Sequence, residues 1–263
     1  MVRLPTSVIL LVVACTSQLV VAQWPDERVA GPFLLHADFS LAEQESLSRD
    51  LSEIQRHLRQ ELALGAPQER IHVFLFSQER TQKRYLKRYF PGVPYRRALY
   101  LKARGPGMVF AHRGKEFATD VRHETTHALL HAVLPMVPLW LDEGLAEYFE
   151  MAPRQRANGH PHLATTRWEI RLRRTKSIAE LEKIRDLSKM GTSEYRQAWA
   201  WVHFMLQGPE PARRELIQFL RDIGAAKPPG SLDRRLRNQI PNLEKKFAHH
   251  FQQRKWRASN AVR

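Results

Sequence analysis

The strongest constraint on the fold is the position along the chain at which strand-like segments stop. Runs of β-branched and aromatic residues occur at 71–76, 98–102 and 108–112, and none follows Phe117. Beyond that point, apolar residues recur only at helical spacing. A small sheet must therefore form in the first half of the chain, and the second half must pack helix against helix. The sequence predicts an α+β fold that is mainly α.

Helical periodicity places the other elements. In the first half it predicts a helix over 41–64 and a basic helix over 78–90, which Pro91-Gly92 ends. After Phe117 the predicted helices are 119–133, 140–151, about 166–174, 177–187, 193–207, 211–223 and 241–256. We expect one domain over 23–263, because 263 residues can build a single core. It would have a mixed lobe over about 30–135 and a helical lobe over about 136–263.

The first 22 residues have the order typical of a secretory signal peptide. Arg3 gives a positive start, Val8–Val13 is an apolar run, and Ala22 is a small residue at the expected cleavage site. We therefore expect export to the periplasm or the extracellular space. A retained anchor helix and a bacterial lipobox, which would lipidate Cys15, stay open as alternatives. Cys15 is the one cysteine of the chain, which excludes internal disulfides and cysteine-rich zinc modules.

An H-E-x-x-H motif, His123-Glu124-Thr125-Thr126-His127, lies in the predicted helix 119–133. Residues four apart lie on one face of a helix, about 6 Å apart along its axis. His123 and His127 can therefore bind one zinc ion, and Glu124 can accept a proton from a water molecule at the metal. Apolar neighbours on both sides of the motif predict that this helix is packed, so its buried polar groups need partners.

A zinc site of this kind needs a third ligand. His131 lies one turn beyond His127, but three ligands along one straight helix cannot converge on one ion. A metzincin would have glycine and histidine where this chain has Leu130 and Val133, so that class is excluded. The remaining candidates lie in the acidic segment 138–150.

HETTH, followed by Leu141-Asp142-Glu143-Gly144-Leu145-Ala146-Glu147-Tyr148-Phe149, resembles the gluzincin metallopeptidases and most closely the bacterial peptidase MA-like group. The resemblance implies a zincin-like fold, with a small N-terminal sheet, a zinc-binding helix and a helical C-terminal half. It implies that Glu143 is the third zinc ligand and that Glu147 hydrogen-bonds a ligating histidine. The implied activity is that of an exported zinc peptidase, in which a zinc-activated water attacks the peptide bond with Glu124 as general base.

Two further features of these families can be sought in the chain. Zinc aminopeptidases hold the free amine of the substrate with a glutamate in a segment that corresponds to 107–112, which has no carboxylate here. We expect that segment to be an edge strand that pairs with an extended peptide, which argues against aminopeptidase action. Tyr195 matches the tyrosine that stabilises the oxyanion in these families. His203 is the reserve candidate for that role, although apolar neighbours indicate a core position.

The chain is strongly basic, with 42 Lys and Arg against 27 Asp and Glu and a net charge of +15. Basic residues crowd the helix 78–90, the segment 171–176 and residues 254–257. No nucleic-acid-binding motif accompanies them, so we expect a solvated cationic surface, or attraction to acidic substrates, an anionic envelope polymer or a membrane surface. A non-catalytic, zinc-stabilised or polyanion-binding envelope protein is the alternative function.

Overall fold

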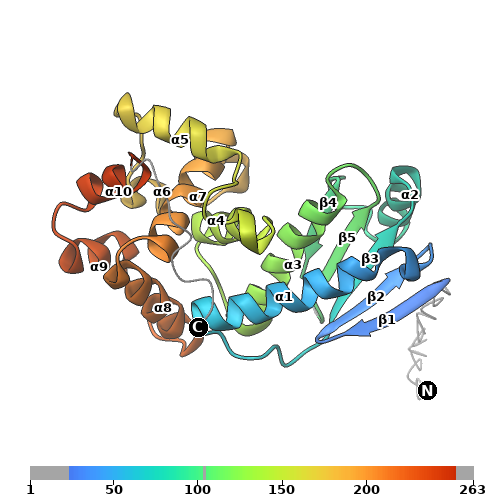
Figure 1. Ribbon diagram of the computed structural model, residues 1–263. Coiled ribbons are helices and arrows are strands. Elements are labelled where there is room, and N and C mark those ends of the chain that lie inside the picture. Colours follow the sequence, from blue (N-terminus) through green and yellow to red (C-terminus); the bar gives the residue numbers. More distant parts are fainter. Residues whose placement is uncertain (1–23, 103–104, 253–263) are drawn as a thin grey trace, which may run out of the picture.

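The structure, a computed structural model, describes residues 24–102 and 105–252 (Figure 1). The predicted signal segment, Cys15 and the basic residues 254–257 lie outside the described residues. No helix within the described ranges is long and apolar enough to cross a membrane.

A five-stranded sheet forms one part of the molecule, with the strand order β1-β2-β3-β5-β4. Strands β2, β3 and β5 are parallel, whereas β1 and β4 are antiparallel to their neighbours. The strands are β1 (Asp26–Ala30), β2 (Phe33–Ala37), β3 (Ile71–Phe76), β4 (Ala98–Leu101) and β5 (Met108–His112).

The expectation that 107–112 forms an edge strand is wrong. Strand β5 lies inside the sheet, with Val109 opposite Val73 of β3 on one side and Tyr100 of β4 on the other. The chain turns back after β4, so β4 pairs on the side of β5 that faces away from β3. Within residues 24–102 and 105–252, the free edge on this side of the sheet therefore belongs to β4.

Helices occupy the rest of the described chain, and the predicted α+β, mainly α class is confirmed. They are α1 (Glu45–Leu62), α2 (Glu79–Tyr89), α3 (Phe117–Val133), α4 (Leu139–Phe149), α5 (His162–Arg171), α6 (Ile178–Leu181), α7 (Thr192–Gln207), α8 (Glu210–Gly224), α9 (Leu232–Gln239) and α10 (Leu243–Gln252). Short 3-10 turns are found at Leu41–Gln44, Pro153–Gln155 and Leu187–Lys189. Helix α5 begins four residues earlier than predicted, α6 is shorter, and α9 and the β1–β2 hairpin were not predicted.

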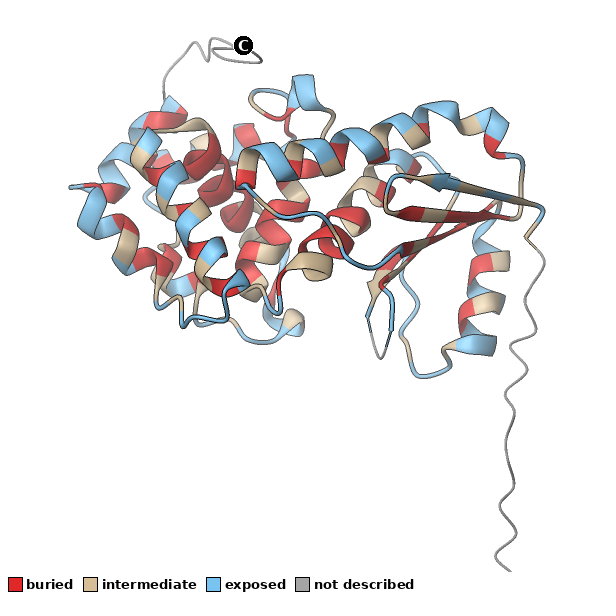
Figure 2. Ribbon diagram, turned by 90° about the horizontal axis from the view of Figure 1, so that it is seen from below, coloured by how far each residue is buried: buried red, intermediate tan, exposed pale blue. Residues whose placement is uncertain are grey.

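The two faces of the sheet bury different residues, because successive strand side chains point to opposite faces. Val73 and Leu75 face α1 and α3 in the main core, which continues into the helical part. Phe74, Phe76 and Phe110 face the other way and pack with Leu86 of α2 in a separate aromatic cluster. In Figure 2 buried residues gather on the sheet and where the helices meet.

Helices α3 and α4 lie between the sheet and the helical part (Figure 1). Helix α4 buries residues around most of its circumference, Trp140, Leu141, Leu145 and Phe149 among them, so it is a central helix. Its neighbours are α3 and α7. The site described below is formed where these three helices meet.

Candidate metal centre

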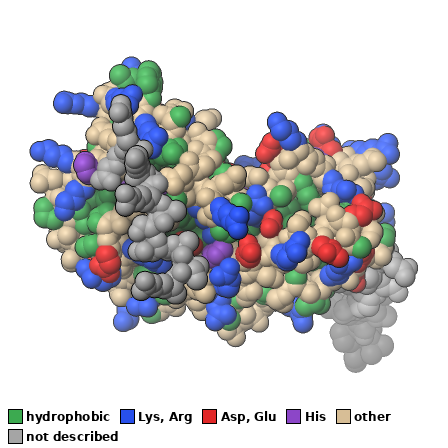
Figure 3. All heavy atoms as spheres, in the orientation of Figure 1, with side chains coloured by type: hydrophobic (Ala, Val, Ile, Leu, Met, Phe, Trp, Pro, Cys, Tyr) green, Lys and Arg blue, Asp and Glu red, His purple; other side chains and the backbone are tan. Residues whose placement is uncertain are grey.

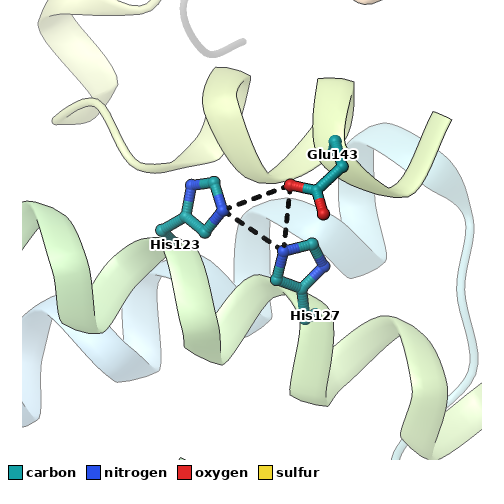
Figure 4. Close-up of side chains that lie close together, drawn as sticks. All are labelled: His123, His127 and Glu143. Carbon is teal, nitrogen blue, oxygen red and sulfur yellow. Dashed lines mark hydrogen bonds and ion pairs between the residues drawn. The ribbon is translucent and has the colours of Figure 1, made fainter. Parts of the chain in front are cut away.

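Helix α3 carries both histidines of the H-E-x-x-H motif. Val121 and Leu130 are buried in the main core, which fixes the rotation of the helix about its axis. His123 and His127, one turn apart, then point toward α4 (Figure 4). His127 is buried and His123 is half-buried.

Helix α4 supplies a carboxylate to the same point. Figure 4 shows Glu143 on α4 pointing between the two histidine rings of α3. Nε2 of His123 lies 3.2 Å from Nε2 of His127, and both atoms lie 3.6 Å from Oε2 of Glu143. The three ligands expected for the metal are therefore brought together.

These distances fit a zinc ion. Ligand atoms at about 2.0–2.2 Å from zinc stand about 3.3–3.6 Å apart when they occupy corners of a tetrahedron. The observed separations of 3.2, 3.6 and 3.6 Å match those edges. Two imidazoles and one carboxylate could hold one zinc ion and would leave one corner of the tetrahedron without a protein ligand.

The other nitrogen of each ring faces a carboxylate. Nδ1 of His123 lies 2.8 Å from Oε2 of Glu150, and Nδ1 of His127 lies 3.0 Å from Oδ1 of Asp142. Glu150 accepts a hydrogen bond from Nδ1 of His123, and Asp142 forms an ion pair with His127 through Nδ1, so each carboxylate favours a ring that keeps its Nδ1 proton when Nε2 loses its own. Both Nε2 atoms point into the site, and each offers a lone pair to a metal once it has lost its proton.

Asp142 contacts two histidines, one through each carboxylate oxygen. Its Oδ2 atom lies 3.0 Å from Nε2 of His131, and its Oδ1 atom faces His127. Burial by itself would raise the pKa of Asp142, but the two rings outweigh burial and hold that pKa well below its usual range. His131, which was excluded as a ligand, contacts Asp142 and so helps to hold that carboxylate beside His127.

Glu147 does not make the contact that the resemblance implied. Its Oε2 atom lies 3.1 Å from Nε2 of His162, and within the described residues no hydrogen bond or ion pair joins Glu147 to His123 or His127. Glu150, directly after the last residue of α4, occupies the supporting position for His123 instead. The sequence signal was present, because Glu150 directly follows the motif, but it did not show which carboxylate faces the ring.

The charges of the site favour protonated rings when no cation is bound. Burial alone would lower the pKa of His127, but Asp142 and Glu143 outweigh it and raise the pKa to about 10. The pKa of Glu143, which burial would raise, is lowered to about 2 by the two histidines. A metal ion that binds here must displace a proton, so its affinity falls as the pH falls.

Gly144 brings α7 close to these ligands. A Cβ atom at Gly144 would lie 2.7 Å from the backbone oxygen of Ala198 on α7, which is too close for any side chain. The glycine next to Glu143 thus lets the two helices touch. Tyr195 lies one turn before Ala198, and the backbone N–H of Gly191 donates to Glu194 at 3.0 Å, which fixes this end of α7.

Tyr195 lies near enough to Glu143 and Glu124 for their charges to act on its hydroxyl. Burial, followed by the charges of Glu143, Glu147 and Glu124, raises the pKa of Tyr195 to about 12, although Arg96 opposes this. Its hydroxyl therefore stays protonated and can donate. No hydrogen bond or ion pair of the Glu124 carboxylate is found in the part of the chain that the structure describes.

A second group, Glu147, His160 and His162, lies next to the first and has a similar composition. The backbone N–H of His162 donates to Nδ1 of His160 at 3.1 Å, so that nitrogen must be unprotonated. Nε2 of His160 then carries the proton, and it donates to the carbonyl oxygen of Glu147 at 3.1 Å. His160 has no lone pair to offer, which leaves two ligands, fewer than a zinc site needs.

His203, the reserve candidate for the oxyanion role, is fully buried in the helical part. Its Nε2 atom lies 2.9 Å from the carbonyl oxygen of Ala157, and its Nδ1 atom lies 3.0 Å from Nε2 of His250. Both ring nitrogens are engaged in the core. His203 is therefore a packing residue, and of the two candidates Tyr195 is the one beside the ligands.

The fold and the site define a class: an α+β protein with a histidine-histidine-glutamate group that could hold a metal. A sequence family described as a protein of unknown function, DUF1570, matches residues 117–229. This range runs from the start of α3 to just beyond α8, so it includes the three ligand positions, Glu124 and Tyr195. No curated protein matches the chain.

Proposed function

We propose that the protein is a zinc-dependent peptidase of the gluzincin type. The observation that carries the proposal is the convergence of His123, His127 and Glu143 at the spacing of a tetrahedral zinc site, with both Nδ1 atoms turned to carboxylates. Bound zinc lowers the pKa of a water molecule and polarises a carbonyl group.

Two side chains of this protein would move or hold protons in the reaction. Glu124 accepts a proton from the attacking water and passes it to the leaving amine. Its carboxylate has no competing partner among the described residues. The protonated hydroxyl of Tyr195 donates to the carbonyl oxygen of the scissile peptide as negative charge develops there.

The free edge of the sheet indicates how a substrate would bind. Among the described residues no strand pairs with the outer edge of β4. This strand packs against α3, and the ring of Tyr100 on it stacks on His127 and His131. An extended peptide can pair with β4 and pass the ligands. Neither β4 nor β5 carries a carboxylate that could hold a free amine, so we propose that the substrate is a peptide segment rather than an N-terminus.

Hydrolysis of quenched fluorescent peptides by the purified protein tests the proposal. We expect zinc-dependent cleavage that a chelator abolishes and added zinc restores. Glu124→Gln should keep zinc and lower the rate by about 10²- to 10⁴-fold, because the amide cannot accept the proton. Glu53→Gln, the same change at an exposed position of α1, is the matched control.

Two results would contradict the proposal. Bound zinc without cleavage of any peptide would favour the alternative of a non-catalytic, zinc-stabilised protein. Loss of zinc in Glu124→Gln as complete as in His123→Ala would make Glu124 a ligand.

A further inference from the structure

The C-terminal end of α5 exposes two large apolar side chains. Trp168 is 54% exposed and Leu172 is 44% exposed. They are four residues apart and so lie on the same side of the helix. The opposite side of α5, with Leu163 and Ile170, is buried against the helical part.

Helix α5 ends in a turn at Arg173 and Arg174, directly after Leu172. Arg173 has a left-handed backbone with φ of 54°, where glycine is usually found. Its N–H donates to the carbonyl of Ile170 at 3.1 Å, and the N–H of Arg174 donates to the carbonyl of Glu169 at 2.9 Å. This is the hydrogen-bond pattern of a Schellman motif. Arg173 thus adopts a left-handed backbone conformation, which is unfavourable for every residue with a side chain.

Three arginines surround the apolar pair without acidic partners. Arg171, Arg173 and Arg174 are exposed, and no ion pair of theirs is found among the described residues. Glu169, the one carboxylate of α5, is buried and bonded to Arg196. The end of α5 therefore presents uncompensated positive charge.

We propose that this tip, Trp168 with Leu172 and Arg171, Arg173 and Arg174, binds the surface of a bilayer that contains anionic lipid. Tryptophan and leucine enter the boundary between headgroups and acyl chains, and guanidinium groups pair with the phosphates around them. A nucleic acid would use the same charges but would leave the leucine in water.

The shape of the molecule agrees with this surface. Figure 1 places α5 at the outer end of the helical part, away from the sheet. In the same orientation, Figure 3 shows hydrophobic and basic side chains next to each other at the upper end of this part. The surface does not include the metal ligands, so the inference is independent of the proposed hydrolysis.

Binding of the full chain to vesicles tests the inference. We expect it to bind phosphatidylcholine vesicles with about 30 mol % phosphatidylglycerol, and to bind pure phosphatidylcholine far more weakly. Replacing the three arginines with glutamine should weaken binding about 100-fold, at about 5-fold for each charge. Trp168→Ala with Leu172→Ala should weaken it about 10-fold or more while leaving its salt dependence intact.

Arg173→Gly separates binding from folding. Glycine relieves the left-handed backbone, so the variant should melt at a higher temperature and yet bind the anionic vesicles about 5-fold more weakly. Arg84, Lys87 and Arg88 on α2 are exposed as well, so replacing them with glutamine removes the same charge elsewhere. That control should change vesicle affinity by less than about 2-fold.

Three outcomes would overturn the inference. The α2 variant could weaken binding as much as the α5 variant, which would mean that net charge alone attracts the vesicles. The double apolar variant could bind as wild type does. Duplex DNA could bind more tightly than the vesicles through the same arginines, which would make nucleic acid the partner.

Discussion

Two groups of two histidines and one glutamate lie side by side in this protein, and they differ in which ring nitrogen is available. In the first, a carboxylate lies beside Nδ1 of His123 and another beside Nδ1 of His127, so both Nε2 atoms face Glu143. In the second, a backbone N–H occupies the lone pair of His160. The same residue types thus form a candidate ligand set in one place and a hydrogen-bonded support in the other.

The difference arises from the secondary structure around each group. His123 and His127 lie in the middle of α3, where backbone N–H groups are already bonded within the helix and cannot reach the rings. His160 precedes α5, where the N–H of His162 has no helical acceptor and turns to the nearest ring. Histidines just before a helix are thus easily used as caps.

The largest expected effect separates the two groups directly. His123→Ala should weaken zinc binding by more than about 10³-fold, because it removes a ligand, whereas loss of a supporting group costs about 10- to 100-fold. His162→Ala should change zinc affinity by less than about 10-fold. Competition titration with a zinc-sensitive dye measures both. An equal loss of zinc affinity in the two variants would mean that both groups belong to one metal site.

Tyr195 should matter for turnover and not for the metal. We expect Tyr195→Phe to lower kcat about 10²- to 10³-fold, with KM and zinc content nearly unchanged, because the hydroxyl acts only as charge develops. Tyr89→Phe, on the exposed side of α2, is the control. A rate within about threefold of wild type would remove Tyr195 from the mechanism.

The two glutamates that follow Glu143, one in α4 and one directly after it, should differ in their effect on the metal. Glu150→Gln should weaken zinc binding about 10- to 100-fold, since the Nδ1 proton of His123 loses its carboxylate. Glu147→Gln should weaken it by less than about 3-fold, because Glu147 faces His162. The same titration compares them. The reverse order would restore to Glu147 the role that the resemblance implied.

His160 should affect stability and leave zinc binding intact. Burial, followed by the charge of His162, lowers the pKa of His160 to about 4, so folding favours the neutral ring. The contribution of the neutral ring to the free energy of unfolding is complete above the ordinary histidine pKa of about 6.5. It is lost as the pH falls from there toward 4. His160→Gln should cost about 2 kcal/mol at pH 7.5 and less at pH 5. Urea unfolding at both pH values measures this, and a constant cost would mean that His160 does not titrate differently on folding.

The sequence predicted the residues of the site better than their contacts. His123 and His127 follow from one helical motif, because residues four apart share a face of the helix, and Glu124 is the residue next to His123 in the same motif. The support by Asp142 and Glu150 depends on the angle at which α4 crosses α3, which no local pattern encodes. Glu147 was assigned to a zinc-ligating histidine by resemblance, whereas its partner His162 is the first residue of α5, 15 residues later in the chain.

The fold was predicted where patterns are strong. The buried strand β3 and the long helices were predicted. Strand β1 was not predicted, because its sequence, DERVA, is rich in charged residues and lacks the pattern of a strand. Helix α9 is missing from the prediction because its sequence, LDRRLRNQ, has few apolar residues. The sequence analysis predicted that β5 lies at the edge of the sheet, but β4 lies there. The order of strands in a sheet depends on pairing between distant segments, which the sequence of one strand does not reveal.

The number of zinc ions bound per chain tests the central claim most directly. Native mass spectrometry and elemental analysis of the purified protein should find one zinc ion per chain, retained in His162→Ala and absent from His123→Ala. Two ions per chain, with one lost in His162→Ala, would show that the second group is a metal site as well. Less than about half an equivalent in the wild-type protein would contradict the account of the first group.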